Sequence, residues 1–299
     1  MKIEAHCFAY NTSIEPLPDP FIFKDMEVHM DRHTSEGIHE VMLYITKKIK
    51  PETLKITDEE KNDTTGILVE QKMRPYKEDL TDVAHLIEGF LSLSYNIPAP
   101  KFETHRIIVG VKTESDEEEK MITEGKISSG FGNIKQPFRP HYYKWSEKIA
   151  EAFKTGEKHI PALSFFSQAV RAEDNNDQEV AFFLYFRIID GYFSQGKQNV
   201  EKFLLKNKNG IAKYINYNED IKNSLKNILN SLGLRSKSNT NFSGLISDLV
   251  LLRHKLTHFS ERDSGSHHNA GLIFDLQVIN FYLKNACALL LIDKTNLKL

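Results

Sequence analysis

The sequence predicts an α+β protein with two domains, a mixed α+β domain over residues 1–141 and an all-α domain over residues 142–299. Three observations lead to this prediction. A length of 299 residues is typical of two domains. In several segments of the first domain, apolar residues alternate with polar ones, as in half-buried strands. From Tyr142 onward this alternation disappears and apolar residues recur at helical spacing.

The first domain combines predicted strands with one predicted helix. Alternation or a β-branched run predicts strands at residues 21–23, 26–30, 41–45 and 107–111. Between Asp79 and Tyr95 the apolar residues follow the helix period, and Pro98 and Pro100 end the pattern. The Gly- and Pro-containing segment 130–140 is the predicted linker.

The second domain is predicted to be entirely helical. Its expected helices cover residues 143–154, 160–172, 178–194, 199–206, 220–232, 242–260 and 270–292. Polar residues interrupt the apolar segment Gly271–Ile292, so we expect a buried helix here and no membrane span.

Composition points to an ordinary globular protein in a reducing compartment. Hydrophobic residues make up 40% of the chain and charged residues 27%. Cys7 and Cys287 are too few for a disulfide framework, and Met1–His6 has no apolar core of signal-peptide length. These features favour the cytoplasm.

Charge is unevenly distributed along the chain. The net charge of −2 argues against a general nucleic-acid binder, but the segment from Lys197 to Lys237 holds nine basic and three acidic residues. This segment could guide an RNA backbone, or it could be an ordinary solvated face. The acidic run 114–119 is best explained as an exposed loop.

The segment Leu251–Phe259 carries the most specific signal. It places Arg253 and His258 five residues apart within a helical stripe of apolar residues, with His254 directly after the arginine. A second copy of this spacing, Arg262 and His267, lies in Ser/Gly/His-rich sequence typical of a loop, where nothing would fix its geometry.

Arg253, His254, Lys255, Leu256 and His258 resemble the Arg-x4-His signature of the HEPN superfamily. The resemblance covers roughly the last 150 residues. It implies an all-α domain, in many members a metal-independent ribonuclease, with two protomers whose motifs line one cleft. It also implies a role as a toxin or in defence against phage.

The chemistry of the two motif side chains fits RNA cleavage. Arginine stays cationic and matches phosphate geometry, so Arg253 is assigned to the phosphate, and His258 to proton transfer. His254 and Lys255 are assigned auxiliary roles as a proton carrier or phosphate contact. On an ideal helix, residues five apart point about 140° apart, so one chain would not close the site unless the last turn unwinds. A working site therefore needs an unwound last turn or a second copy of the motif, and the HEPN resemblance implies the second, a homodimer with a composite site.

Asp190 lies in a strongly apolar segment and should need a partner. It either orients an active-site group or pairs with a neighbour such as Arg187, and the second reading is favoured. A rival metal site would use His258, His267, His268 and Asp263, but no metal-binding spacing supports it, so neither a metal nor a cofactor is expected.

The sequence therefore predicts a metal-independent endoribonuclease that attacks RNA through its 2′-OH. The first domain would sense an activating ligand, an antitoxin protein or an invading nucleic acid. The alternative is a catalytically inactive HEPN module that dimerises and binds a ligand or partner. A helix end whose arginine and histidines merely cap carbonyls and face solvent is the competing structural explanation.

Overall fold

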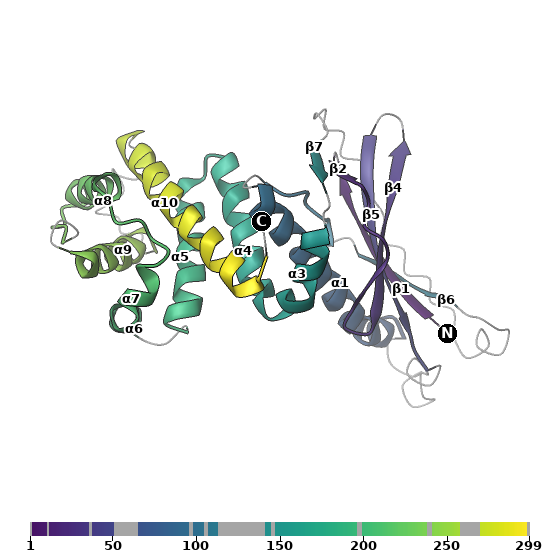
Figure 1. Cartoon of the computed structure of the whole chain (residues 1–299). Helices are drawn as coiled ribbons and strands as arrows, with labels where there is room; N and C mark the ends of the chain where they lie inside the picture. The colour runs from purple at the N-terminus through teal and green to yellow at the C-terminus, as the bar shows by residue number, and fades with distance from the viewer. Residues whose placement is uncertain are drawn as a thin grey trace. The chain divides into compact units, whose positions relative to one another are not determined.

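The α+β prediction is confirmed by the computed structural model (Figure 1). It describes residues 2–10, 12–35, 38–50, 65–95, 98–104, 107–112, 141–144, 147–195, 199–237, 241–257 and 270–297. The chain forms two compact units. Met1–Leu91 with Pro100–Glu157 make the sheet unit, and Ser92–Ala99 with Lys158–Leu299 make the helical unit.

The sheet unit is built on a five-stranded antiparallel sheet of strand order β3-β4-β5-β1-β6. Its strands are β1 (Lys2–Tyr10), β3 (Phe21–Phe23), β4 (Met26–Ser35), β5 (Ile38–Lys48) and β6 (Ile108–Lys112). Alternate residues of β1, starting with Ile3 and ending with Ala9, are buried. Ile3 packs with Met73 and Tyr76 of α1 (Thr65–Tyr95), which lies along one face of the sheet.

A short parallel sheet pairs β2 (Thr12–Glu15) with β7 (His141–Lys144). The expectation that strands end before Tyr142 was therefore wrong, and the helix predicted from Tyr143 begins only at Glu147. Tyr143 pairs with Ile14, and this distant partner supplies the hydrogen bonds that hold Tyr143 in a strand.

Helix α3 (Glu147–Gly156) completes the sheet unit. The Phe153 ring packs against Phe21 and Phe90, with ring centroids 5.0 and 5.4 Å apart. Gly156 ends the helix against Phe90, where a Cβ atom would come within 2.8 Å of the ring. Only glycine fits this approach without a shift of the ring.

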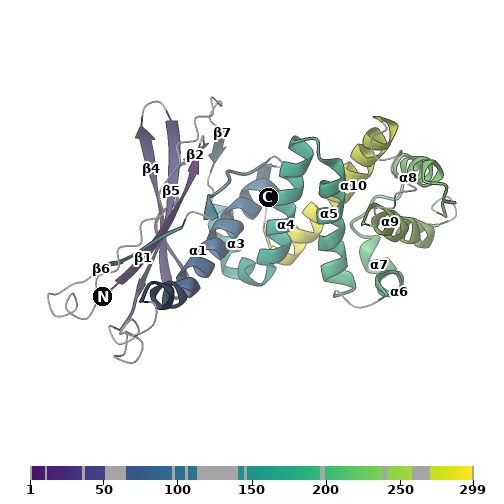
Figure 2. The same cartoon turned by 180° about the vertical axis from the view of Figure 1, so that it is seen from behind.

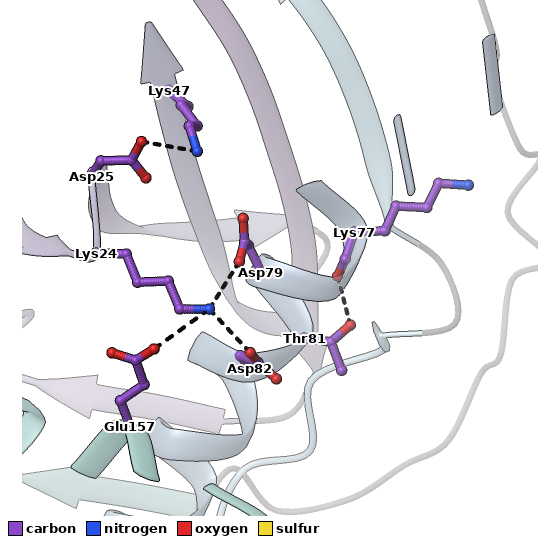
Figure 3. A network of polar contacts seen from close by, with 8 residues as sticks. All are labelled: Lys24, Asp25, Lys47, Lys77, Asp79, Thr81, Asp82 and Glu157. Carbon is purple, nitrogen blue, oxygen red and sulfur yellow. Dashed lines mark hydrogen bonds and ion pairs between the residues drawn. The ribbon is translucent and has the colours of Figure 1, made fainter. Parts of the chain in front are cut away.

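Lys24 links the β3–β4 turn to the helices of the same unit (Figure 3). Its Nζ lies 3.0 Å from Asp79, 3.4 Å from Asp82 and 3.9 Å from Glu157. Lys24 has a φ of 55°, the left-handed conformation that closes this turn. The network fixes the hairpin to α1.

The helical unit contains α4 (Ile160–Asp174), α5 (Gln178–Phe193), α6 (Val200–Lys206), α7 (Lys208–Ile211), α8 (Glu219–Ser231), α9 (Phe242–Thr257) and α10 (Ala270–Thr295). Helix α10 packs against α4, α5 and α8, as both views show (Figures 1 and 2). Asn280 of α10 is fully buried and donates to the backbone oxygen and side chain of Gln178 at 2.8 and 3.0 Å. This polar contact fixes the register of α10 on α5.

Among the described helices, α10 alone is long and apolar enough to cross a membrane by length and composition. Leu276, Ile279, Leu283 and Leu290 of this helix are buried against the neighbouring helices. One side of α10 is therefore buried as the sequence predicts, while Phe274, Phe281 and Leu289 of the same helix are exposed.

Candidate functional site

Helix α9 carries the predicted motif. Its first turn is capped by Asn241, whose Oδ1 accepts a hydrogen bond from the backbone N–H of Gly244 at 2.9 Å. Leu245, Leu249 and Leu252 are buried along one side of the helix. The buried stripe sets the rotation of α9 and thereby fixes where the following residue, Arg253, projects.

Arg253, His254 and Lys255 lie in the last described turns of α9. Arg253 and Lys255 are half-buried and His254 is exposed. His258 lies outside the described residues, as do Arg262, His267, His268 and Asp263. Two of the auxiliary residues and the arginine are thus placed by the structure, while the position of the proposed proton carrier stays a prediction.

Arg253 and His254 line the same cavity, of about 370 Å³. The start of α6 and Lys237 form its other wall. Its described lining residues are Asn199, Val200, Glu201, Lys237, Ser247, Asp248, Val250, Leu251, Arg253 and His254. Lys255 and Asp190 are not among them. The cavity therefore brings together two cations and an imidazole, groups that bind and protonate phosphate oxygens.

Arg253 makes an aromatic contact with helix α5. Its guanidinium carbon lies 5.6 Å from the centre of the Phe186 ring of α5. A planar guanidinium stacks well on such a ring while its edge still offers N–H donors. Phe186 itself is buried. The contact supplies a geometric reason for arginine instead of lysine at this position.

Asp248 is a part of the site that the sequence reasoning missed. Its side chain is fully buried on α9 and accepts hydrogen bonds from Ser236 Oγ at 2.6 Å and from the backbone N–H of Lys237 at 2.9 and 2.8 Å. The carboxylate thus fixes residues 236–237 to α9 and brings Lys237 to the cavity edge. An acid inside the apolar stripe, five residues before Arg253, was the available signal.

Asp190 is nine per cent exposed, and its carboxylate accepts a hydrogen bond from Ser194. Asp190 thus forms a structural pair with a neighbour, which is Ser194 and not the example Arg187, whose guanidinium lies 5.2 Å from the Phe165 ring centre. Ser194, the residue that follows α5, lies one helical turn after Asp190 and so comes within reach of its carboxylate. Within the described part of the chain, Asp190 forms no hydrogen bond with Arg253 or His254.

The basic segment, residues 197–237, contributes Asn199, Val200, Glu201 and Lys237 to the cavity, and most of its cations are exposed. Lys202, Lys206, Lys208, Lys213, Lys226, Arg235 and Lys237 are exposed, and Lys197 lies outside the described residues. Lys222 differs, since its Nζ is 2.7 Å from Glu219 and 4.3 Å from the Tyr217 ring centre. These exposed cations, on α6, α7 and α8 and in the segments that follow α7 and α8, are the groups that could contact a polyanion.

No cluster of three or more histidine, cysteine, aspartate or glutamate side chains suited to a metal occurs within the described ranges. Both cysteines are buried, and burial raises the pKa of each thiol above its ordinary value. Neither is therefore suited to nucleophilic chemistry.

Compared with protein-family models, with curated proteins and with solved structures, the chain shows no significant match. The HEPN resemblance accordingly depends on the motif residues and on their place in a helical unit.

Proposed function

We propose that the helical unit is a metal-independent endoribonuclease of HEPN type. The observation that carries this proposal is the cavity beside α9, which Arg253 and His254 line together with Lys237. Arg253, His254 and Lys255 lie in the last described turns of α9 within the helical unit, and this position supports the proposal.

The proposed reaction is an intramolecular transesterification. The 2′-OH of a ribose attacks the adjacent phosphorus, a 2′,3′-cyclic phosphate forms and the bond to the 5′-oxygen breaks. Arg253 binds the phosphate and stabilises its added charge. His258 transfers a proton, either from the attacking 2′-OH or to the departing 5′-oxygen, and His254 or Lys255 assists at the other of these two oxygens.

The basic segment would extend RNA binding beyond the cavity. Exposed lysines on α6, α7 and α8 offer sequence-independent phosphate contacts, whose strength falls with salt. RNA is the favoured polyanion because the proposed reaction needs a 2′-OH.

Two protomers would complete the site. Residues five apart on an ideal helix diverge by about 140°, so Arg253 of one motif and a histidine of another are better placed to act on one phosphate. We expect a homodimer in which two copies of α9 face a shared cleft.

The inactive ligand-binding module is the second candidate. Glu201 lines the same cavity as Arg253, and its carboxylate would repel a phosphodiester while tolerating a zwitterionic ligand. Such a module would dimerise and bind RNA, a small ligand or a partner protein without cutting.

The biological setting follows from the resemblance. We propose a cytoplasmic toxin or anti-phage effector, in which the sheet unit responds to an activating ligand or an antitoxin. The resemblance does not extend to the sheet unit, so its partner is open.

Total RNA incubated with the purified full chain tests the activity, beside an Arg253→Ala/His258→Ala double variant. Cleavage by the wild type and none by the variant is expected. RNA binding without cleavage by either protein would favour the ligand-binding module.

A further inference from the structure

A second open surface of the helical unit lies between α8 and α10. It is a groove of about 610 Å³, lined in the described part of the chain by Asp220, Asn223, Ser224, Asn227, Phe274, Asp275, Gln277, Val278, Phe281 and Tyr282. Asp248, Arg253 and His254 are not among these residues. The groove is therefore distinct from the proposed ribonuclease cavity.

The α10 side of the groove is unusually apolar for an outer surface. Phe274 is 65% exposed and Phe281 is 58% exposed, and they are two of the six exposed large hydrophobic side chains in the described residues. Their spacing of seven residues, about two helical turns, places both on one side of α10 with Val278 between them. Exposed aromatic side chains clustered in this way typically mark an interaction site.

Polar contacts between the two helices hold the groove in shape. Asn227 Nδ2 donates to Asp275 at 3.3 Å. The Tyr282 hydroxyl donates to Asp220 at 3.0 Å and accepts from Asn218 Nδ2 at 2.7 Å. These bonds connect α8 to α10 along the groove, so a partner would meet a preformed surface, which lowers the entropic cost of binding.

The charge of the groove is negative. Asp220 and Asp275 contribute two carboxylates, and the described lining residues include no lysine, arginine or histidine. Within the described chain the side-chain partners of these carboxylates are the neutral groups of Asn227 and Tyr282. Both acids therefore have the capacity to accept a charge-assisted hydrogen bond from an incoming cation.

We propose that this groove binds a basic amphipathic helix of a partner protein. Two apolar side chains one heptad apart would pack against Phe274 and Phe281, which lie about 10 Å apart along the axis of α10. Lysine or arginine beside them would pair with Asp220 and Asp275. A second copy of this chain fits less well, because a symmetric pairing brings the same carboxylates together. The inference does not depend on ribonuclease activity.

The test uses the full chain and a panel of fluorescent 16-residue amphipathic peptides. Each has leucine or phenylalanine at heptad spacing and lysine beside them, and a matched panel carries glutamate in place of lysine. We expect saturable binding of lysine peptides by fluorescence anisotropy, at least about tenfold tighter than of glutamate peptides. The Asp220→Lys/Asp275→Lys variant should reverse this preference.

Phe281→Asp should weaken binding of the lysine peptides at least about tenfold. Leu289→Asp is the matched control, since Leu289 is exposed on the same helix but does not line the groove, and it should bind normally. Far-UV circular dichroism and the melting temperature show whether each variant is folded. Arg253→Ala should also bind like the wild type, which separates this proposal from the ribonuclease.

Three results would overturn the proposal. One is failure of every lysine peptide to bind the folded wild type. Another is binding that neither Phe281→Asp nor the charge-reversed variant changes. The third is a concentration-dependent dimer in sedimentation that Phe281→Asp abolishes, because the groove would then be occupied by a second copy.

Discussion

Lys24 in the sheet unit and Arg253 in the helical unit are both cations held by neighbouring elements, but their surroundings differ. The Lys24 ammonium lies within 4 Å of three carboxylates, so its charge is directed at groups of the same fold (Figure 3). Arg253 lies over the Phe186 ring and borders a cavity of about 370 Å³. Charge clustering alone therefore does not identify a site. A cation that borders open volume has room for an anionic ligand, whereas one enclosed by carboxylates mainly connects elements.

The largest expected effect is on RNA cleavage, which should depend on Arg253 and not on Lys24. Arg253→Ala and His258→Ala should each reduce RNA cleavage by on the order of 10²- to 10⁴-fold, because each removes a group that acts on the reacting phosphate. Single-turnover rates on a short RNA measure this loss. Three separate control variants, Lys24→Met, Arg262→Ala and His267→Ala, should each keep most of the wild-type rate of RNA cleavage. Wild-type cleavage by the His258 variant would refute the assignment.

Next in size is the loss of the buried acid beside the cavity. Asp248→Ala should lower the free energy of unfolding by about 1–3 kcal/mol, because Ser236 and the backbone N–H of Lys237 lose a charged acceptor in a buried place. Urea denaturation measures the change. Asp174→Ala, which removes an exposed acid, is the control and should change stability by less than about 0.5 kcal/mol. An Asp248 effect as small as this control would mean that residues 236–237 are held in another way.

A smaller effect on the free energy of unfolding is expected for the Lys24 ion pairs in the sheet unit. Lys24→Met should lower the free energy of unfolding by about 0.2–1 kcal/mol, since ion pairs in contact with water are screened. The difference from the wild type should shrink further in high salt. Chemical denaturation in low and high salt checks both statements. A loss above about 2 kcal/mol, independent of salt, would show that Lys24 is more than a surface link.

The smallest effect concerns pH. Burial, aided by the charge of Lys158, lowers the pKa of His159 from its ordinary value of 6.5, and the ring hydrogen-bonds the Tyr192 hydroxyl at 2.8 Å. The unfolded chain then binds the proton more readily, so this stability is present above pH 6.5 and is lost as the pH falls through the folded pKa. His159→Gln should reduce the drop in melting temperature between neutral and acidic pH. An unchanged drop would assign the acid sensitivity to other groups, such as His6, whose pKa burial also lowers.

The fold was predictable where its signals are local. The strands at β3, β4, β5 and β6 and the long helices of the second unit follow from alternation and helical period. Strand β1 was missed because its inward residues Ala5, Cys7 and Ala9 are small, so the alternation is weak. Strand β7 was missed because its partner, β2, lies far away in the sequence. Helix α1 begins at Thr65, well before the predicted start at Asp79, and continues through Pro75.

The candidate site was predictable only in part, for the same reason. A short motif identified Arg253 and His254, and the structure places both at one cavity. The role of Asp248 depends on Ser236 and Lys237, which tertiary folding brings to α9 and no local pattern reveals. Similarly, the helical period predicted α10 but not which of its apolar residues α4, α5 and α8 would leave exposed.

We propose that Arg253 and His258 cleave RNA through its 2′-OH without a metal. The most direct test incubates the full chain with one labelled RNA in excess EDTA and analyses the product ends, beside a DNA of the same sequence. We expect cleavage in EDTA, a 2′,3′-cyclic phosphate on the upstream fragment and an intact DNA strand. Loss of all cleavage in EDTA, or cutting of the DNA, would contradict this mechanism.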